Sequence, residues 1–130
     1  MFKKILSILA ATIWISISEF LRNQFVLNSY WVEHYQKLGL TFPAESINGA
    51  VWGIWSLCYA ISIYFISRKY SFTATVCLSW FIGFVLMWLV IGNLLVLPFN
   101  MLPYAIPWSI VEALVASFII YKITPIETEK

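Results

Sequence analysis

Residues 104–121 read YAIPWSIVEALVASFIIY, an apolar stretch in which Glu112 is the one charged residue. At about 1.5 Å of rise per residue, a helix of this length approaches the roughly 30 Å of hydrocarbon in a bilayer. A carboxylate near a bilayer centre costs about 2.5 to 3.5 kcal/mol on insertion scales, so such a group normally faces the interior of a helix bundle. The stretch predicts a transmembrane helix and makes Glu112 a candidate functional residue.

The composition indicates the same class of protein. Hydrophobic residues make up 62% of the chain and charged residues 11%, whereas soluble domains contain about 25% charged residues. We therefore expect an integral membrane protein with one membrane domain over residues 1–130, because the spans leave no length for a separate soluble unit. The formal net charge of +2 is too small to indicate a nucleic-acid partner.

Charge-free stretches locate the other spans. No charged residue lies between Glu45 and Arg68, or between Lys69 and Glu112. The second stretch is long enough for one helix, a turn and half of another helix. The expected spans cover about residues 4–23, 47–67, 72–97 and 104–122. Because the apolar segments do not alternate with polar residues as strands would, we predict an all-α, up-down bundle of four transmembrane helices.

The distribution of Lys and Arg predicts the orientation. Four alternating spans place Lys3, Lys4, Arg68, Lys69, Lys122 and Lys130 on one side, against Arg22 and Lys37 on the other. Since cytoplasmic loops are richer in Lys and Arg, both termini are expected in the cytoplasm. The expected location is a plasma membrane or a bacterial inner membrane.

The first span has an alternative interpretation. Lys3 and Lys4, followed by the apolar residues up to Ser18, also fit the basic and apolar regions of a signal peptide. Cleavage after the small residues Ser16 and Ser18 would remove the first helix. We favour a retained helix, because serines are poorer than alanines at such sites and no soluble mature domain follows.

Polar residues in the first span form a stripe. Thr12, Ser16, Glu19 and Asn23 are spaced by four, three and four residues, so they share one face of a helix. Glu19 and Arg22 are three residues apart and can pair locally. A polar stripe within lipid is expected to face protein or water.

Small residues predict where the helices touch, because helices in lipid associate by close packing rather than by hydrophobic burial. The second span contains Gly49, Gly53, Ser56 and Ala60; the third contains Ser79 and Gly83; the fourth contains Ala105, Ser109, Ala113, Ala116 and Ser117. We expect close helix contacts along these three faces. Glu112 adjoins the last of them, so it is expected to point toward a neighbouring helix.

The first connection, about residues 24–46, is longer than a hairpin turn needs. Its apolar or aromatic residues recur at helical spacing and are Leu27, Trp31, His34, Tyr35 and Leu38. We predict a short interfacial helix here, ended by Gly39 and Pro43. Trp31 and His34 are its candidate residues for covering the mouth of the bundle.

Position along the helices gathers polar residues in the outer half of the bundle. The candidate ligand or proton site consists of Glu112, Glu19, Arg22, Asn23, Asn48 and Asn93. This set predicts an outward-facing pocket for a small cationic or amphiphilic ligand, and proton-coupled transport is one form that such a function can take.

The sequence lacks the motifs of several common chemistries. His34 is the only histidine, and no histidine and carboxylate cluster has zinc spacing, so neither a metal nor a haem is expected. Cys58 and Cys77 do not form a CxxC motif and are expected to be small packing residues. The chain has no aspartate, no Gly-rich phosphate loop and no GxSxG motif. We expect no cofactor.

The plan of four short spans with a carboxylate in the first, here Glu19, is similar to that of the small multidrug resistance transporters. The chain departs from that family in its long first connection, in Glu112 and in its inside-positive charge bias. The similarity is limited to the plan and to Glu19, and it implies carboxylate-dependent binding by analogy alone.

Three hypotheses follow. The first is a ligand-binding or transport protein of the bilayer. The second is an accessory or structural subunit, either a homo-oligomer or part of a larger membrane complex, with Glu112 hydrogen-bonded between helices. The third is a membrane enzyme for a lipid-like substrate, with a carboxylate as general acid or base; its candidate residues are Glu19, Arg22, His34 and Glu112.

Overall fold

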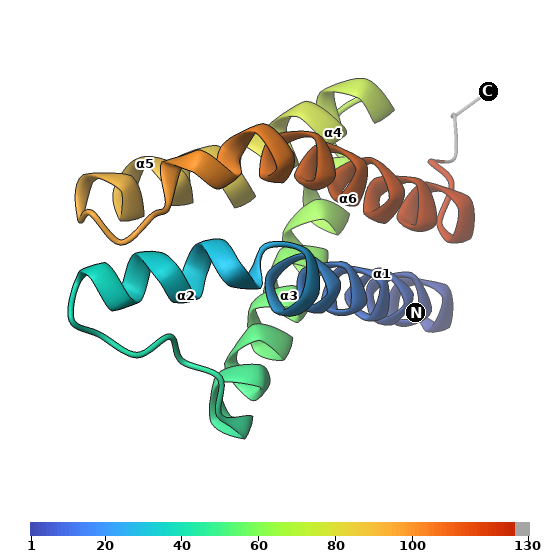
Figure 1. Ribbon diagram of the computed structural model, residues 1–130. Coiled ribbons are helices and arrows are strands. Elements are labelled where there is room, and N and C mark those ends of the chain that lie inside the picture. The colour runs from blue at the N-terminus through green and yellow to red at the C-terminus, as the bar shows by residue number, and fades with distance from the viewer. Residues whose placement is uncertain (127–130) are drawn as a thin grey trace.

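The computed structural model describes residues 1–126, and all regular structure in this range is helical (Figure 1). The elements are α1 (Phe2–Leu21), η1 (Arg22–Val26), α2 (Asn28–Lys37), α3 (Ser46–Ser67), α4 (Phe72–Trp80), η2 (Phe81–Val85), α5 (Leu86–Asn93), η3 (Phe99–Met101) and α6 (Leu102–Ile123). The prediction of an all-α chain is confirmed for this range. Lys130, one of the residues used to predict orientation, lies outside the described residues.

Four helices are long and apolar enough to cross a membrane. They run over Phe2–Val26, Ser46–Ser67, Phe72–Asn93 and Phe99–Ile123. The third is one continuous rod made of α4, η2 and α5, in which η2 is a π-helical turn. The predicted number of long apolar helices is therefore confirmed.

The third connection is placed differently from the expectation. The third helix ends at Asn93 rather than near residue 97, and the fourth begins at Phe99 rather than near residue 104. Pro103, which precedes the expected start of the fourth span, lies in the first turn of α6. A proline is tolerated there because the first N–H groups of a helix have no carbonyl partner within it.

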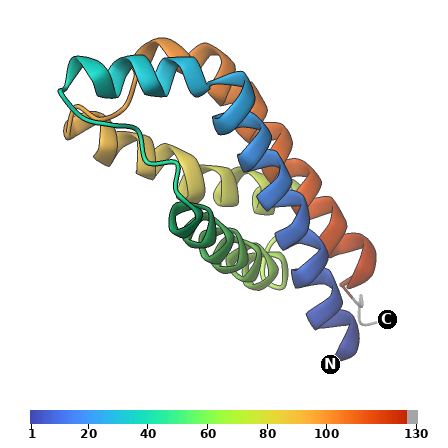
Figure 2. The same ribbon diagram turned by 60° about the horizontal axis from the view of Figure 1, so that its bottom comes forward.

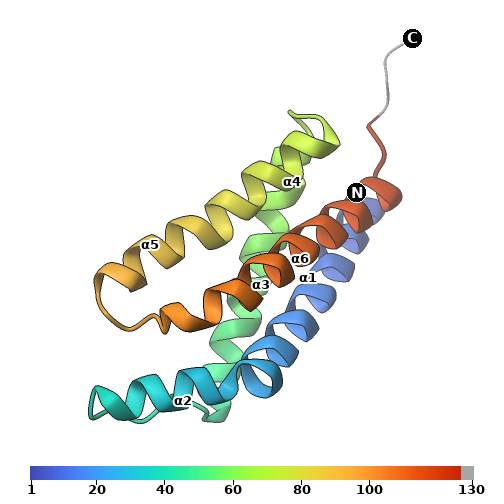
Figure 3. The ribbon, with the colours of Figure 1, turned by 45° about the horizontal axis from the view of Figure 1, so that its top comes forward.

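The helices form an up-down arrangement with one strongly oblique member. α1 and α6 lie side by side and run in opposite directions, and the α4–α5 rod packs on α6 (Figures 1 and 3). α3 contacts α1, α4 and α6 but crosses them obliquely. The chain begins and α6 ends at the same end of the molecule (Figure 2), which we call the termini end. The opposite end, with α2 and the first and third connections, is called the pocket end.

The main core lies where α1, α3 and α6 meet. Its buried hydrophobic residues are Ala11, Ile15, Tyr59, Ala60, Ile63, Phe84, Ala116 and Ile120. The small-residue face of α6 is fully buried along Ala105, Ser109, Ala113, Ala116 and Ser117. This part of the packing prediction is confirmed.

The helical glycines lie on two kinds of helix face, one packed tightly against a neighbouring helix and one with free space beside it. A Cβ added at Gly83 would lie 2.6 Å from a ring carbon of Tyr59, so this glycine permits close approach of α3. A Cβ added at Gly49 or Gly53 would have no atom within 4 Å. The predicted close face of α3 is confirmed at Ser56 and Ala60, which are both fully buried, and is wrong at Gly49 and Gly53, in the first two turns of this oblique helix (Figure 1).

The predicted short helix of the first connection is present as α2. Leu27, just before α2, is buried with Leu97, Met101 and Ala105. The helix ends with Gly39 at φ +71°, a conformation that glycine adopts without strain. The connection then returns to α3 across the pocket end.

Cys58 and Cys77 are both free and exposed. Their expected role as packing residues is wrong, because each lies on the face of its helix that points away from the bundle.

Candidate functional site

The polar stripe of α1 ends in a compact hydrogen-bonded group. Arg22 Nη2 lies 2.6 Å from Glu19 Oε1, as the spacing of three residues predicted. Asn23 Nδ2 donates to Glu19 Oε2 at 3.0 Å, so both carboxyl oxygens of Glu19 are occupied. Trp31 Nε1 donates to Asn23 Oδ1 at 3.1 Å and connects this group to α2.

A π-helical turn carries part of this group. η1 extends α1 from Arg22 to Val26, and the Arg22 guanidinium lies 5.1 Å from the centre of the Phe84 ring, which belongs to the π-helical η2. Single π-helical turns are often found at functional sites. No sequence pattern in the chain had indicated either of these turns.

Glu112 of α6 faces the same group across the helix interface. Its side chain is fully buried and accepts a hydrogen bond from Ser18 Oγ at 2.6 Å on Oε2. Arg22 Nη1 lies 3.7 Å from that same oxygen. Glu112 therefore points toward a neighbouring helix, as its place beside the small-residue face indicated.

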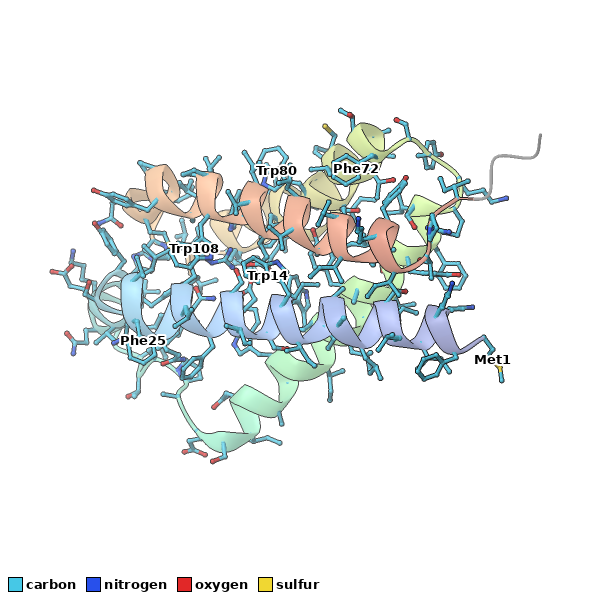
Figure 4. All side chains as sticks on the ribbon, turned by 90° about the vertical axis from the view of Figure 1, so that its right-hand side faces the viewer. Met1, Trp14, Phe25, Phe72, Trp80 and Trp108 are labelled. Carbon is cyan, nitrogen blue, oxygen red and sulfur yellow. The ribbon has the colours of Figure 1, made fainter. Side chains whose placement is uncertain are left out.

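Two tryptophans enclose the Ser18–Glu112 contact. Trp108 Nε1 donates to Ser18 Oγ at 2.9 Å, and Trp14 Nε1 donates to the Glu112 carbonyl oxygen at 3.1 Å. Figure 4 shows both indole rings in the space between α1 and α6. Each of these hydrogen bonds joins α1 to α6.

Arg22 has a carboxyl group on either side. Glu19 and Glu112 are 2% and 0% exposed, and the guanidinium between them is 4% exposed. Within the described residues, Arg22 Nη1 and Glu112 Oε1 have no hydrogen-bond partner. Two carboxyl groups and one guanidinium are electrically neutral together only when one carboxyl group carries a proton. We call Glu19, Arg22 and Glu112 the ionic cluster.

A pocket of about 390 Å³ opens beside Glu19 and is called the acidic pocket. It is lined by Ser16, Glu19, Phe20, Asn23, Gln24, Pro43, Ala44, Glu45, Ser46, Asn48, Gly49, Trp52 and Gly53. The unpacked face at Gly49 and Gly53 forms part of its wall. The space exists because α3 diverges from α1 here.

A second pocket of about 370 Å³ adjoins it and is called the aromatic pocket. It is lined by Arg22, Asn23, Trp31, Tyr35, Phe42, Pro43, Asn48, Val51, Trp52, Met87, Trp88, Ile91, Val96, Met101 and Ala105. Phe42 stacks on Trp31, with ring centres 5.7 Å apart, and closes one side. Asn23, Pro43, Asn48 and Trp52 line both pockets, so the two share a wall.

The candidate residues from the sequence are distributed unevenly over these features. Glu19, Asn23 and Asn48 line the acidic pocket, whereas Arg22, Asn23, Asn48 and Trp31 line the aromatic pocket. Glu112 lines neither pocket and lies behind Arg22 in the interface between α1 and α6. Asn93 is exposed at the end of α5 and lines neither pocket.

His34 is placed outside the pockets as well. Its Nε2 lies 2.8 Å from the carbonyl oxygen of Leu95, a residue with φ 64° in the third connection. It joins α2 to that connection. Of the two expected cover residues, Trp31 lines a pocket and His34 does not.

Sequence reasoning missed several residues of the site. They are Ser18, Phe42, Glu45, Trp52 and Trp88. Trp52 follows Asn48 by four residues, so helical spacing could have placed it on the same face. Phe42 had no such signal, because it reaches the pocket through the return of an irregular segment.

Within residues 1–126, no group of three or more His, Cys, Asp or Glu side chains could hold a metal ion. The arrangement offers instead a carboxylate-lined cavity, an aromatic cavity and a buried ionic cluster beside both. In comparisons with known proteins, no family model, no curated protein and no solved structure matches the chain.

Proposed function

We propose that this chain is an integral membrane protein that binds a small amphiphilic cation at its pocket end. Four helices of sufficient length and apolarity support insertion into a bilayer. The basic residues Lys3, Lys4, Arg68, Lys69 and Lys122 gather at the termini end. By the positive-inside rule this end faces the cytoplasm, and the pockets then lie in the outer half.

The charge of the acidic pocket supports a cationic group. Its described lining includes the carboxyl groups of Glu19 and Glu45 and contains neither Lys nor Arg. The indole of Trp52 and the ring of Phe20 border the same space. A cation in this position gains both a carboxylate and aromatic faces, which attract cations through their quadrupoles.

The aromatic pocket supports an apolar part on the same ligand. Its walls are mainly apolar, with Trp31, Tyr35, Phe42 and Trp88 as the aromatic members beside the shared Trp52. Such concave, mostly apolar cavities with few polar groups are typical of small-molecule sites. The proposal rests on one observation, namely that a carboxylate-lined pocket and an aromatic pocket share a wall.

A series of quaternary ammonium ions tests this function. We expect hexyltrimethylammonium to bind the purified protein in nanodiscs, tetramethylammonium to bind more weakly, and neutral hexanol to bind least, by isothermal titration calorimetry. Glu19→Gln should weaken binding of the hexyl cation at least about tenfold, equivalent to about 1.4 kcal/mol. Glu33→Gln is the matched control, because Glu33 is exposed on α2 and lines neither pocket. Equal binding of the cation and hexanol would contradict the proposal.

A second candidate is an accessory subunit of a membrane complex. Two observations favour it: Glu112 lies in a closed helix interface, and Gly49 and Gly53 leave an open small-residue face on α3. Purification from native membranes with a stoichiometric partner, lost on Gly53→Leu, would support this candidate. The enzyme hypothesis has less support, since two of its four candidate residues, His34 and Glu112, line neither pocket.

A further inference from the structure

We infer that a cation bound at Glu19 exchanges for one proton held by Glu112, with Arg22 as the group that moves between the two carboxyl groups. The inference rests on the proposed function, because it describes how the acidic pocket accepts its ligand. It concerns the ionic cluster, of which the proposed ligand needs to contact only Glu19.

A cation in the acidic pocket has to compete with Arg22 for the carboxylate of Glu19. Both oxygens of Glu19 already accept hydrogen bonds, from Arg22 at 2.6 Å and from Asn23 at 3.0 Å. A cation that pairs with Glu19 therefore competes with Arg22, because the single negative charge of Glu19 cannot neutralise two cations. Leaving the arginine without a carboxylate partner in such a buried position would cost several kcal/mol of free energy.

The structure offers Arg22 a second place. Its Nη1 lies 3.7 Å from Glu112 Oε2, beyond hydrogen-bond distance, and has no hydrogen-bond partner within the described residues. Glu112 Oε1 also has none. A small movement of the guanidinium toward α6 would pair both groups as a two-point arginine–carboxylate contact, which is among the strongest hydrogen-bonded arrangements in proteins.

Charge balance requires a proton in this exchange. Before binding, ionised Glu19, Arg22 and neutral Glu112 have a net charge of zero. After binding, ionised Glu19 holds the cation and Arg22 holds ionised Glu112, and the net charge is zero again. The O–H bond of Glu112 breaks, its electron pair stays on the carboxylate, and the proton leaves to water. Without that release, the buried group would carry one uncompensated positive charge, which a low-dielectric site strongly disfavours.

The surroundings of Glu112 leave few other groups that could take part. Among the described residues, the titratable or charged side chains near it are Glu19 from α1, Arg22 from η1 and Tyr59 from α3. The Tyr59 hydroxyl donates to the Ser79 carbonyl oxygen at 2.9 Å and is committed there. The α4–α5 rod presents the uncharged ring of Phe84 to Arg22.

Counting protons tests the exchange directly. Hexyltrimethylammonium is titrated into the wild-type protein by calorimetry in two buffers of different ionisation enthalpy. We expect about one proton released per cation bound, and an affinity that falls about tenfold for each pH unit of acidification over the range in which the free cluster keeps its proton. Binding without proton release would overturn the inference and leave the proposed function intact. Absence of binding would overturn both.

The Glu112→Gln variant assigns the proton. It mimics a permanently neutral Glu112, so we expect weaker cation binding with no proton release and no dependence on pH. Glu33→Gln should release the same number of protons as the wild type. Ser18→Ala, which removes the donor to Glu112 Oε2, keeps the release but shifts the pH range, and it serves if Glu112→Gln does not fold. Proton release by Glu112→Gln equal to that of the wild type would contradict the role of Glu112.

Discussion

Each end of the bundle has an arginine that contacts other elements, and the two arginines differ in their partners. At the termini end, Arg68 donates to the Thr124 carbonyl oxygen at 2.8 Å and to Ser67 Oγ, and its guanidinium lies 5.1 Å from the Tyr64 ring. At the pocket end, Arg22 lies between two carboxyl groups and keeps one nitrogen without a hydrogen bond within the described residues. The first arginine joins α3 to the end of α6, whereas the second has two alternative partners.

Helix packing also differs between the two ends and is looser at the pocket end. Near the middle and the termini end, Gly83 admits the Tyr59 ring, and Ala60, Ile63, Ala116 and Ile120 are buried. At the pocket end, a Cβ added at Gly49 or Gly53 would have no atom within 4 Å, and both glycines border a cavity. The difference teaches that a similar small-residue signal can produce either a helix contact or a pocket wall, depending on the crossing of the helices.

Removing the charge of Arg22 should have the largest effect. Arg22→Met leaves Glu19 and Glu112 buried without their shared cation, and breaking such a group typically costs about 3 to 5 kcal/mol. Unfolding in mixed micelles of sodium dodecyl sulfate and a mild detergent measures the change. A smaller loss of unfolding free energy for Arg22→Met than for Arg68→Met would contradict the expectation that Arg22 contributes more to stability than Arg68.

Filling the close contact at Gly83 should come next. Gly83→Ala places a methyl group 2.6 Å from a Tyr59 ring carbon, and overpacking of this kind costs about 1 to 3 kcal/mol. The same unfolding assay applies, and Tyr59→Phe in the same background should not restore stability, since the clash involves ring carbons as well as the hydroxyl. An unchanged midpoint would show that α3 and η2 are not in tight contact.

The arginine at the termini end should matter less. Arg68→Met removes hydrogen bonds to Thr124 and Ser67, each worth about 0.5 to 1.5 kcal/mol net, but leaves no buried carboxylate unpaired within the described residues. We expect a loss of roughly 1 to 2 kcal/mol and an unchanged affinity for hexyltrimethylammonium, measured by unfolding and calorimetry. A change in affinity would link the termini end to the pockets.

The smallest effect, of opposite sign, is expected at Gly53. A methyl group there meets no atom within 4 Å, and alanine is favoured over glycine in a helix by about 0.5 to 1 kcal/mol. Gly53→Ala should therefore raise the unfolding midpoint slightly, while Gly83→Ala lowers it. Loss of stability at Gly53 would indicate that this face is covered by a partner helix, as the accessory-subunit candidate requires.

Local features of the site followed from spacing. Glu19 and Arg22 pair because three residues separate them on one helix, and the small residues that accompany Glu112 indicated that it faces protein. Asn93 and His34 show the limit of such reasoning. Asn93 was assigned to the site by its depth along the third span, and His34 was assigned to its cover by helical spacing with Trp31. The earlier end of α5 and the contact of α2 with the third connection place them away from both pockets.

The amino-acid sequence by itself determined the number and the approximate positions of the long apolar helices, because length, apolarity and the positions of charges are local properties of the chain. It also determined which residues share a helix face. Only the tertiary structure decided that α3 crosses obliquely, that its first turns leave a cavity, and that Glu112 lies behind Arg22 rather than in the pocket. These outcomes depend on how whole helices pack against one another, which no single stretch of sequence specifies.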